Sequence, residues 1–397
     1  MLKRYFAFIF LIAGALTMQA QIAVTADTVF TMAGAPLTPG VVLIKDGKIE
    51  AVGSSLSIPA GYKTYTAKVV TPGLIDARSV VGLSGAYNVP SDQDQLERSS
   101  PLQPELRAID AYNPDEKLVA FLREHGITTI HTGHGWGALM SGQTMVAKTK
   151  KGQTDEVTIR PVEMMAMTLG PSVSSYFSSP GNRSKEMAML RTELLKAQTA
   201  MKKNKDTAAT ADLKQQMLQQ LLRGQTRALI AANTAVDILS AIRLAKEFNL
   251  KLVLEEVAEG YRVADQIKAS GAGVIVHATM ARAGGETLNM TMENAALLTK
   301  AGIPVSIESG YEAYVPKTRV VLYEAAVAMA RGGLPYEEAL KAITINPAKL
   351  LGLDNRIGSL EKGKDADLVL YDGDPFEYTT KTCVVIIDGK VEAENCN

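Results

Sequence analysis

The chain has 397 residues, of which 46% are hydrophobic, and its basic and acidic residues each number 42. This composition is typical of a globular protein, and the length allows one large domain together with a smaller one. The even charge balance provides no basic surface for nucleic acid, so we expect no nucleic-acid partner.

Residues 1–20 differ from the rest of the chain. A basic start at Lys3 and Arg4 is followed by an uncharged apolar run from Tyr5 to Leu16. This order is typical of a secretory signal peptide, and the run is short for a membrane span. We therefore predict a signal peptide and an exported, periplasmic protein. An uncleaved membrane anchor is the alternative.

Both ends of the remaining chain have the pattern of β-structure. Asp46-Gly47 supplies a hairpin turn between two apolar runs. Near the C-terminus, a strand pattern at Ala366–Tyr371 is followed by a turn and a second apolar run. We predict that residues 21–68 and 355–397 form one small β-sandwich built from both termini.

Residues 69–354 alternate between apolar strand-like runs and helical patterns. The runs are apolar along their whole length, as strands buried on both faces are. This alternation predicts an α/β fold with a parallel sheet, and eight such units fit a (β/α)8 TIM-like barrel. The strands are predicted at 69–75, 127–132, 144–149, 163–169, 227–233, 251–256, 273–278 and 303–309.

One stretch, residues 184–225, departs from this rhythm. It is rich in Lys, Gln, Met and Leu, with a break at 205–211. We predict a helical insertion after the fourth strand, which either covers the barrel mouth as a lid or lies on the surface.

The two cysteines of the chain, Cys383 and Cys396, both lie near its C-terminus. An exported protein can join them as a disulfide. Two free or buried thiols remain the alternative.

Several short sequence segments of the chain are similar to segments of one known family. They are Asp46–Ile49, Val70–Asp76, Gly126–Thr129, Ser141–Gln143, Ala342–Ala348 and Gly363–Val369. In their order and spacing the chain resembles the metal-dependent amidohydrolase superfamily, in its imidazolonepropionase-like branch. The resemblance implies a barrel with a β-sandwich and a hydrolase that cleaves non-peptide C–N bonds, in amides or cyclic amides, with metal-bound hydroxide.

The metal ligands that this resemblance implies are largely substituted. The family phrase after the first strand ends in His-x-His, and here those positions hold Arg78 and Val80. A guanidinium repels a divalent ion and valine has no donor atom. Glu256 stands where the family has a histidine of the sixth strand, and we expect it to form an ion pair with Arg78.

The fifth and eighth strands show the same loss. Asn233 stands at or near a histidine position of the fifth strand, and it is a poor metal donor. The family's general-base aspartate of the eighth strand corresponds to Ser309 or to Glu308, depending on the register. In the first case the base is gone, and in the second a longer carboxylate remains.

The chain has four histidines, and His131 and His134 are the pair with metal-like spacing. They follow the second strand and so face the barrel mouth, where they are the remaining candidates for a zinc site. Trp136 lies beside them among glycines and is a candidate for lining a ligand pocket, together with Asn233 and Ser309. No cofactor is otherwise expected.

Three functions follow from these substitutions. The first is a family hydrolase whose catalysis is degenerate or altered. The second is a non-catalytic homologue that binds a small-molecule ligand, or that pairs with an active amidohydrolase in a hetero-oligomer or forms a homo-oligomer. The third is a metal-free hydrolase in which Arg78 stabilises an oxyanion and Glu256 or Glu308 acts as general base.

Overall fold

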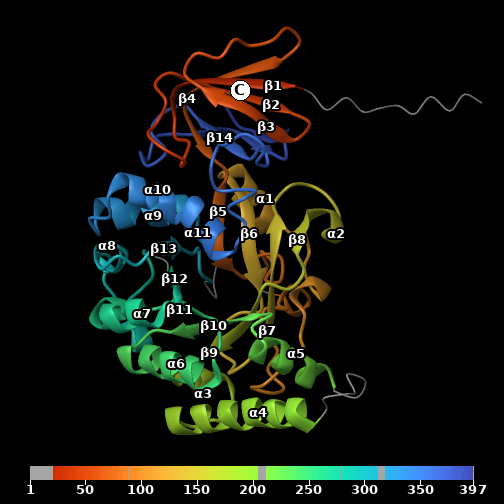
Figure 1. The fold of residues 1–397 in the computed structure, drawn as a ribbon, viewed down its shortest axis with the longest axis vertical. Helices are drawn as coiled ribbons and strands as arrows, with labels where there is room; N and C mark the ends of the chain where they lie inside the picture. The colour runs from red at the N-terminus through yellow and green to blue at the C-terminus, as the bar shows by residue number, and fades with distance from the viewer. Residues whose placement is uncertain (1–20, 88, 204–211, 278, 312–317, 397) are drawn as a thin grey trace, which may run out of the picture.

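The structure is a computed structural model that describes residues 21–87, 89–203, 212–277, 279–311 and 318–396. Figure 1 shows a β-sheet at one end of the molecule, an α/β body in the middle and a long helix, α4, at the opposite end. The predicted signal peptide lies outside the described residues.

Strands from both ends of the chain form one seven-stranded sheet. Its order is β16-β15-β14-β4-β1-β2-β3. Antiparallel pairing of β4 with β14, which places Val70 opposite Leu370, joins the two ends. The bounds are β1 (Ile22–Val29), β2 (Gly40–Lys45), β3 (Lys48–Gly53), β4 (Lys63–Pro72), β14 (Leu368–Tyr371), β15 (Thr382–Ile387) and β16 (Lys390–Glu394).

The predicted hairpin turn at Asp46-Gly47 is confirmed. It joins β2 to β3, and both residues have positive φ, 50° and 77°, as the turn that suits a two-residue hairpin requires. Val24, Val42 and Leu370 share one apolar core with side chains from both ends of the chain. The limits of the predicted β-sandwich remain a prediction.

The body of the molecule is built on a nearly closed, barrel-like sheet. Its order is β13-β12-β11-β10-β9-β7-β6-β5, and β13 lies next to β5. A short strand, β8, pairs with β7 outside this path. The bounds are β5 (Leu74–Ser79), β6 (Ile127–Gly133), β7 (Gly142–Lys148), β8 (Thr158–Arg160), β9 (Met164–Thr168), β10 (Arg227–Ala232), β11 (Leu252–Glu256), β12 (Gly273–Val276) and β13 (Val305–Ile307).

All eight predicted strands correspond to strands of the structure, but the expectation of an all-parallel sheet is wrong at β7. This strand runs antiparallel to both β6 and β9. The loop between β6 and β7 holds only residues 134–141, and a parallel crossover needs a dozen residues or more. The first predicted run, 69–75, is also divided between β4 and β5 at Gly73, where a Cβ atom would lie 2.2 Å from the Thr128 hydroxyl.

Helices follow the strands and cover the outer face of the barrel-like sheet (Figure 1). Thr234 caps α6 by accepting a hydrogen bond from the Asp237 backbone, and Asn249 ends it in a left-handed conformation. No helix in the described parts of the chain is both long and apolar enough to cross a membrane. The bounds are α1 (Lys117–Glu124), α2 (Thr154–Val157), α3 (Pro171–Tyr176), α6 (Ala235–Phe248), α7 (Ala264–Ser270), α8 (Asn294–Lys300), α9 (Val321–Ala330), α10 (Tyr336–Ala342) and α11 (Ile345–Leu350).

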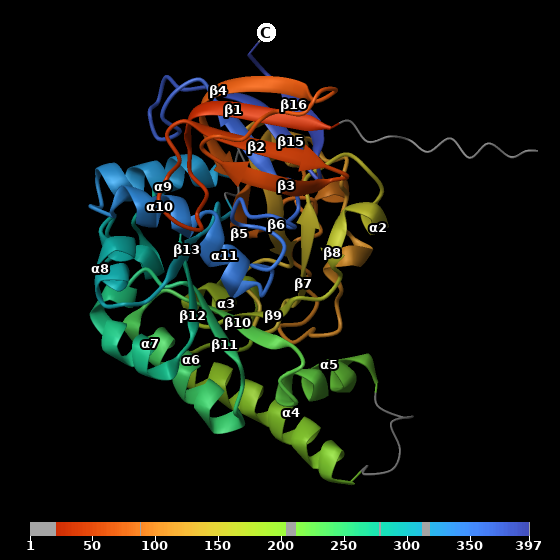
Figure 2. The same cartoon turned by 45° about the horizontal axis from the view of Figure 1, so that its top comes forward.

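The predicted insertion contains two helices, α4 (Arg183–Lys203) and α5 (Leu213–Leu222), at the end of the molecule away from the seven-stranded sheet (Figure 2). Glu186 accepts a hydrogen bond from the Gly170 backbone, and Arg183 pairs with Asp237 at 2.6 Å. The start of α4 therefore lies at the carboxyl ends of β9 and β10. The predicted break at 205–211 falls outside the described residues, and the role as a lid remains a prediction.

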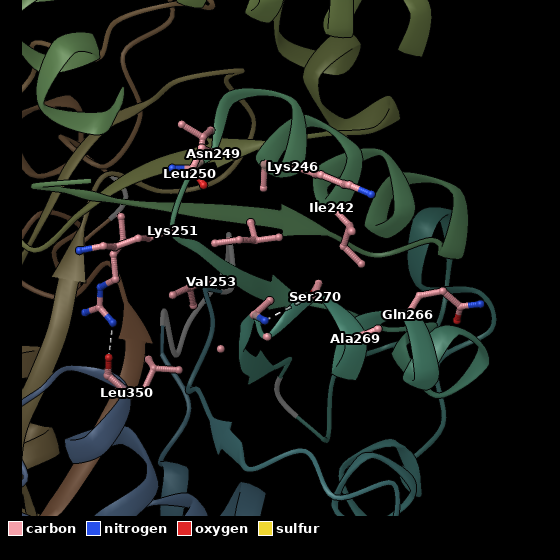
Figure 3. Close-up of a pocket in the computed structure, with 16 residues that line it drawn as sticks. Ile242, Lys246, Asn249, Leu250, Lys251, Val253, Gln266, Ala269, Ser270 and Leu350 are labelled. Carbon is pink, nitrogen blue, oxygen red and sulfur yellow. Dashed lines mark hydrogen bonds between the residues drawn. The ribbon is translucent and has the colours of Figure 1, made fainter. Parts of the chain in front are cut away.

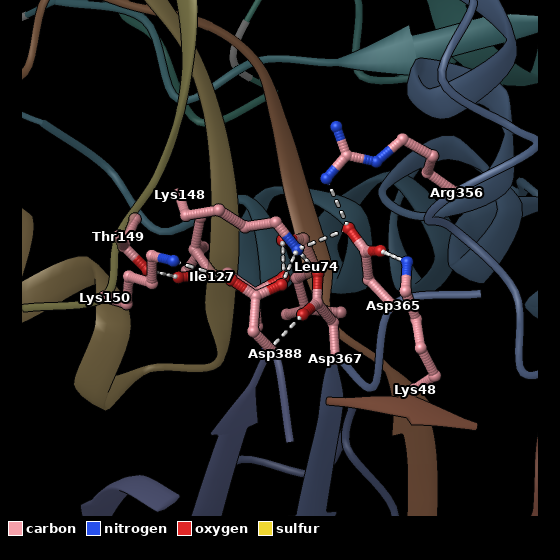
Figure 4. A network of polar contacts seen from close by, with 11 residues as sticks. Lys48, Leu74, Ile127, Lys148, Thr149, Lys150, Arg356, Asp365, Asp367 and Asp388 are labelled. Carbon is pink, nitrogen blue, oxygen red and sulfur yellow. Dashed lines mark hydrogen bonds and ion pairs between the residues drawn. The ribbon is translucent and has the colours of Figure 1, made fainter. Parts of the chain in front are cut away.

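A buried lysine joins the two sheets. Lys148 of β7 contacts Asp367, and its Nζ lies 3.3 Å from Asp365 and 3.1 Å from Asp388 (Figure 4). These three aspartates flank β14 and β15 of the seven-stranded sheet. Lys148 is 3% exposed, so this ionic contact between the two sheets is held away from water.

The two cysteines form a disulfide, Cys383–Cys396. It ties the end of the chain beyond β16 to β15. Of the two alternatives left by the sequence, the structure has the bonded one.

Candidate functional site

Polar side chains gather at the carboxyl ends of the strands of the barrel-like sheet. Arg78 comes from β5, Glu255 and Glu256 from the end of β11, His277 follows β12, and Glu308 follows β13. The carboxyl ends of such strands meet at one face, which is where barrel enzymes place their sites. We call these five residues the polar centre. Arg78 and Glu308 are 0% exposed, so its charges are held away from water.

The guanidinium of Arg78 is engaged on all sides. Its Nε lies 3.3 Å from Oε2 of Glu255, and its two other nitrogens donate to the backbone carbonyls of Ser79 and His134. It also lies over the Trp136 ring, 5.0 Å from the centroid. Every guanidinium nitrogen therefore has a partner inside the protein.

The expected ion pair between Arg78 and Glu256 is wrong in its partner, because the pair forms with Glu255. Successive residues of a strand point to opposite faces, so a shift of one position exchanges the two carboxylates. Burial raises the pKa of Glu255, and the Arg78 charge opposes that rise.

Glu256, His277 and Glu308 form a second group. Nδ1 of His277 lies 3.1 Å from Oε2 of Glu256 and 3.6 Å from Oε1 of Glu308. Asn233 donates to the same Oε2 of Glu256 at 2.9 Å. Burial acts against the charged form of His277, but the two carboxylates raise its pKa well above the ordinary value.

The two carboxylates of this group differ in their surroundings. Burial tends to raise the pKa of Glu256, yet His277 and Asn233 hold it below its usual value. Burial raises the pKa of Glu308 well above its usual value, the charges of Glu255 and Glu256 add to that rise, and His277 opposes it. A cavity of about 10 Å³ adjoins His277 and has room for roughly one water.

The register at the eighth strand places Ser309 and Glu308 in different groups. Ser309 donates from its backbone and its hydroxyl to the two oxygens of Asp76, at 3.0 and 2.5 Å, and Thr318 donates to the Ser309 hydroxyl. Burial raises the pKa of Asp76 to about 7 against these hydrogen bonds. Ser309 therefore hydrogen bonds to β5, while Glu308 faces His277.

The two histidines predicted as a pair, His131 and His134, have different surroundings. His131 uses both ring nitrogens, with the Ala77 carbonyl at 2.8 Å and the Thr144 hydroxyl at 2.7 Å. Burial and the Arg78 charge lower the pKa of His134 to about 4. Within the described residues, no group of three potential metal donors includes either histidine.

A large cavity lies elsewhere. It has a volume of about 830 Å³ and is lined at the amino ends of β10, β11 and β12, by Lys251, Val253 and Ser270 among others (Figure 3). That end is opposite the polar centre. The predicted pocket-lining residues His131, His134, Trp136, Asn233 and Ser309 do not border it, and their role stays a prediction.

Sequence reasoning missed two members of the polar centre, Glu255 and His277. The signal for His277 was present, because it directly follows a buried apolar run as the other members do. The family resemblance, however, implies no ligand on the seventh strand, so His277 is not among the residues selected from the sequence.

A model of the amidohydrolase family matches residues 116–392. The chain belongs to the amidohydrolase family. Imidazolonepropionase of Streptococcus pyogenes is 24% identical over 394 residues, covering 85% of each chain, and that of Thermoplasma volcanium is 23% identical over 362 residues, covering 86% of this chain and 87% of the other. The amidohydrolase tasK of Hapsidospora irregularis is 23% identical over 90% of this chain, which spans 40% of the length of tasK.

The solved structure of an amidohydrolase from Thermotoga maritima matches this amidohydrolase with a TM-score of 0.88. It is 29% identical, and the match covers 94% of this chain and all of the other. The frame of the family is therefore present over nearly the whole described chain.

A metal ion at the end of the first strand does not fit this amidohydrolase. The two positions that the family phrase gives to histidine hold Arg78 and Val80, both buried. A fixed positive charge and an apolar side chain offer a divalent ion no donor there.

Proposed function

We propose that this amidohydrolase is a (β/α)8 barrel with a composite β-sandwich that binds a small molecule at its polar centre and has lost the metal-dependent hydrolysis of its family. The observation that supports this most is the buried ion pair of Arg78 with Glu255 at the end of β5. A cationic side chain stands where the family resemblance requires a metal ligand.

The proposed loss of metal-dependent hydrolysis follows from the positive charge of Arg78. Hydrolysis in the family pattern needs a metal to make hydroxide available near neutral pH. A divalent ion beside the 0% exposed Arg78 would meet an unscreened positive charge. Glu255 neutralises Arg78 instead, so the pocket keeps its charge balance without an ion at that place.

We propose an amide or cyclic amide as the ligand class. This rests on the resemblance to proteins named imidazolonepropionase and on the hydrogen-bonding side chains of the polar centre. We further propose that the protein is exported to the periplasm, binds no nucleic acid, and forms a homo-oligomer or pairs with an active amidohydrolase.

A metal-free hydrolase that uses Arg78 to stabilise an oxyanion is less well supported. All three guanidinium nitrogens already have partners within the protein. A donor that is engaged in this way has no hydrogen bond free for a developing charge.

The test is an assay of the purified full chain on a panel of N-acyl and cyclic amide compounds, with and without a chelator. We expect no turnover above the buffer control in either condition, and saturable binding of at least one compound by calorimetry. Turnover that the chelator abolishes would contradict the proposal. Chelator-resistant turnover that Arg78→Ala or Glu256→Gln reduces would favour the metal-free mechanism.

A further inference from the structure

We infer that the cavity of about 830 Å³ at the amino ends of β10, β11 and β12 binds a small organic anion, an apolar body that carries a carboxylate or phosphate group. We call it the basic cavity. This inference goes beyond the proposed function, because it concerns a second site that takes no residue from the polar centre.

The charged side chains that line the basic cavity are all cationic, namely Arg227, Lys246 and Lys251. Within the part of the chain that the structure describes, no Asp or Glu lines it. The whole chain, by contrast, has 42 basic and 42 acidic residues. Positive charge is therefore concentrated here, and an anionic ligand that neutralises it is favoured.

A second cavity of about 420 Å³ extends this positive surface. It shares Arg227 and Lys251 with the basic cavity and adds Arg160, Lys349 and Glu163. Glu163 is almost fully buried and is contacted by both arginines, with Nη1 of Arg160 2.8 Å from its Oε2. The two cavities together have five cationic side chains and one carboxylate, which leaves a net charge of +4.

The ends of three helices act against an anion here, but more weakly. The caps that end α6 and α7, Asn249 and Gly271, line the basic cavity, and so does Leu350 at the end of α11. Each helix C-terminus is equivalent to about half a negative charge. Three such ends offset less than half of the four positive charges, so the cavities keep a positive potential.

Two of the cationic side chains are available to a ligand. Lys246 and Lys251 make no ion pair or side-chain hydrogen bond with any other described residue. In Figure 3 they extend toward opposite sides of the basic cavity. Each ammonium group lies on a flexible four-carbon stem, so it can turn toward an anion without breaking an existing contact.

The inner wall of the basic cavity is apolar. Leu250 and Val253 are 8% and 2% exposed, and Ile242 and Leu350 line the cavity beside them. The cavity volume lies within the range of about 300–1,000 Å³ that is usual for small-molecule sites. An apolar wall with cationic side chains around it suits an organic anion better than an inorganic ion.

Calorimetric titration of the full chain with octanoate and octyl phosphate tests the site. We expect saturable binding of at least one of them, and their relative affinities show whether a carboxylate or a phosphate fits better. Octanol lacks the charge and inorganic phosphate lacks the apolar body. Each should bind at least about fivefold more weakly, as expected when one contact of about 1 kcal/mol is missing.

Substitutions of exposed residues locate the bound anion. Lys246→Gln and Lys251→Gln should each weaken its binding about fivefold. Lys300→Gln is the matched control, because Lys300 lies in the last turn of α8 as Lys246 does in α6, but it lines neither cavity. Ala269→Trp fills the cavity from α7 and should abolish binding with both lysines in place. Thermal unfolding of each variant checks its fold, and all four should unfold cooperatively near the wild-type temperature.

Three results would overturn the inference. The first is a wild type that binds neither octyl anion. The second is octanol binding as tightly as the anions, because charge would then have no part in recognition. The third is anion binding that persists in both Ala269→Trp and the double variant Lys246→Gln, Lys251→Gln, because the anion would then bind elsewhere. Amide binding at the polar centre is measured separately, so either proposal can fail while the other stands.

Discussion

Nε of Arg78 lies 3.3 Å from Oε2 of Glu255, and both side chains are almost completely buried at the carboxyl ends of β5 and β11. The pair brings one fixed positive and one negative charge together where water cannot screen them. Arg78 stands where the family resemblance implies a histidine.

Removing one member of this pair should destabilise the protein strongly. Arg78→Met leaves Glu255 buried and uncompensated, so we expect a loss of about 3–5 kcal/mol in the free energy of unfolding by urea. The double variant Arg78→Met, Glu255→Met should recover most of that loss. Arg191→Met, which breaks a half-exposed pair with Glu247, should cost at most about 1 kcal/mol. Equal losses in the single and double variants would show that the two charges are not coupled.

Lys148, which links the two sheets, should contribute as much to the free energy of unfolding as the Arg78–Glu255 pair does. Lys148→Met leaves Asp365, Asp367 and Asp388 facing one another, and we expect a loss of about 3–5 kcal/mol on unfolding. Lys150→Met is the control, because Lys150 also pairs with Asp388 but is 26% exposed, and it should cost at most about 1 kcal/mol. Similar effects of the two substitutions would contradict a specific role for the buried lysine.

Asp76 should make stability fall as the pH rises. Its pKa is about 7 in the folded protein against 3.8 ordinarily, so the folded chain keeps a proton that the unfolded chain releases. The contribution is complete below pH 4 and is lost as the pH rises through 7, with a slope of at most about 1.4 kcal/mol per pH unit. In Asp76→Asn this part of the slope should disappear, as measured by urea unfolding at a series of pH values. An unchanged slope would show that Asp76 is ionised in the folded state.

At lower pH, Asp365 should make the stability of the fold rise with pH. The Lys148 and Lys48 charges, acting against burial, lower the pKa of Asp365 to about 2. A carboxylate with a lowered pKa stabilises the fold above its ordinary pKa of 3.8, and this stabilisation is lost as the pH falls towards 2. Asp365→Asn should be less stable than the wild type at pH 6 and should approach it at pH 2. A constant difference between the two proteins would contradict the lowered pKa.

The disulfide should stabilise the C-terminal strand. Cys383 and Cys396 are 13 residues apart, and a loop of this size is worth about 3 kcal/mol by the chain-entropy estimate. Reduction, or replacement of both cysteines by serine, should lower the midpoint of urea unfolding by a corresponding amount. A reductant that lowers the midpoint of the serine variant too would point to an effect unrelated to the disulfide.

The strands were predictable because both faces of each are buried. Runs such as those at Ala228 and Val253 are apolar throughout, and turns at Asp46-Gly47 and Asp388-Gly389 mark the hairpins at both ends of the chain. The direction of β7 was not predictable from apolarity, which is the same in parallel and antiparallel strands. Only the short loop before it distinguishes the two.

The pairing of residues within the polar centre could not be predicted from the sequence, for a related reason. Glu255 and Glu256 are adjacent and chemically alike, so choosing the partner of Arg78 requires the register at the end of β11. Likewise, Ser309 and Glu308 differ by one position but belong to different groups. The backbone of Glu256, with its positive φ, follows no strand periodicity.

The most direct test of the account is anomalous diffraction at the zinc absorption edge from crystals of the full chain grown with Zn²⁺. We predict no peak at the end of β5, with Arg78 still paired to Glu255. A peak at the end of β5 beside Val80 or His134, with Arg78 turned away, would contradict the loss of the family site.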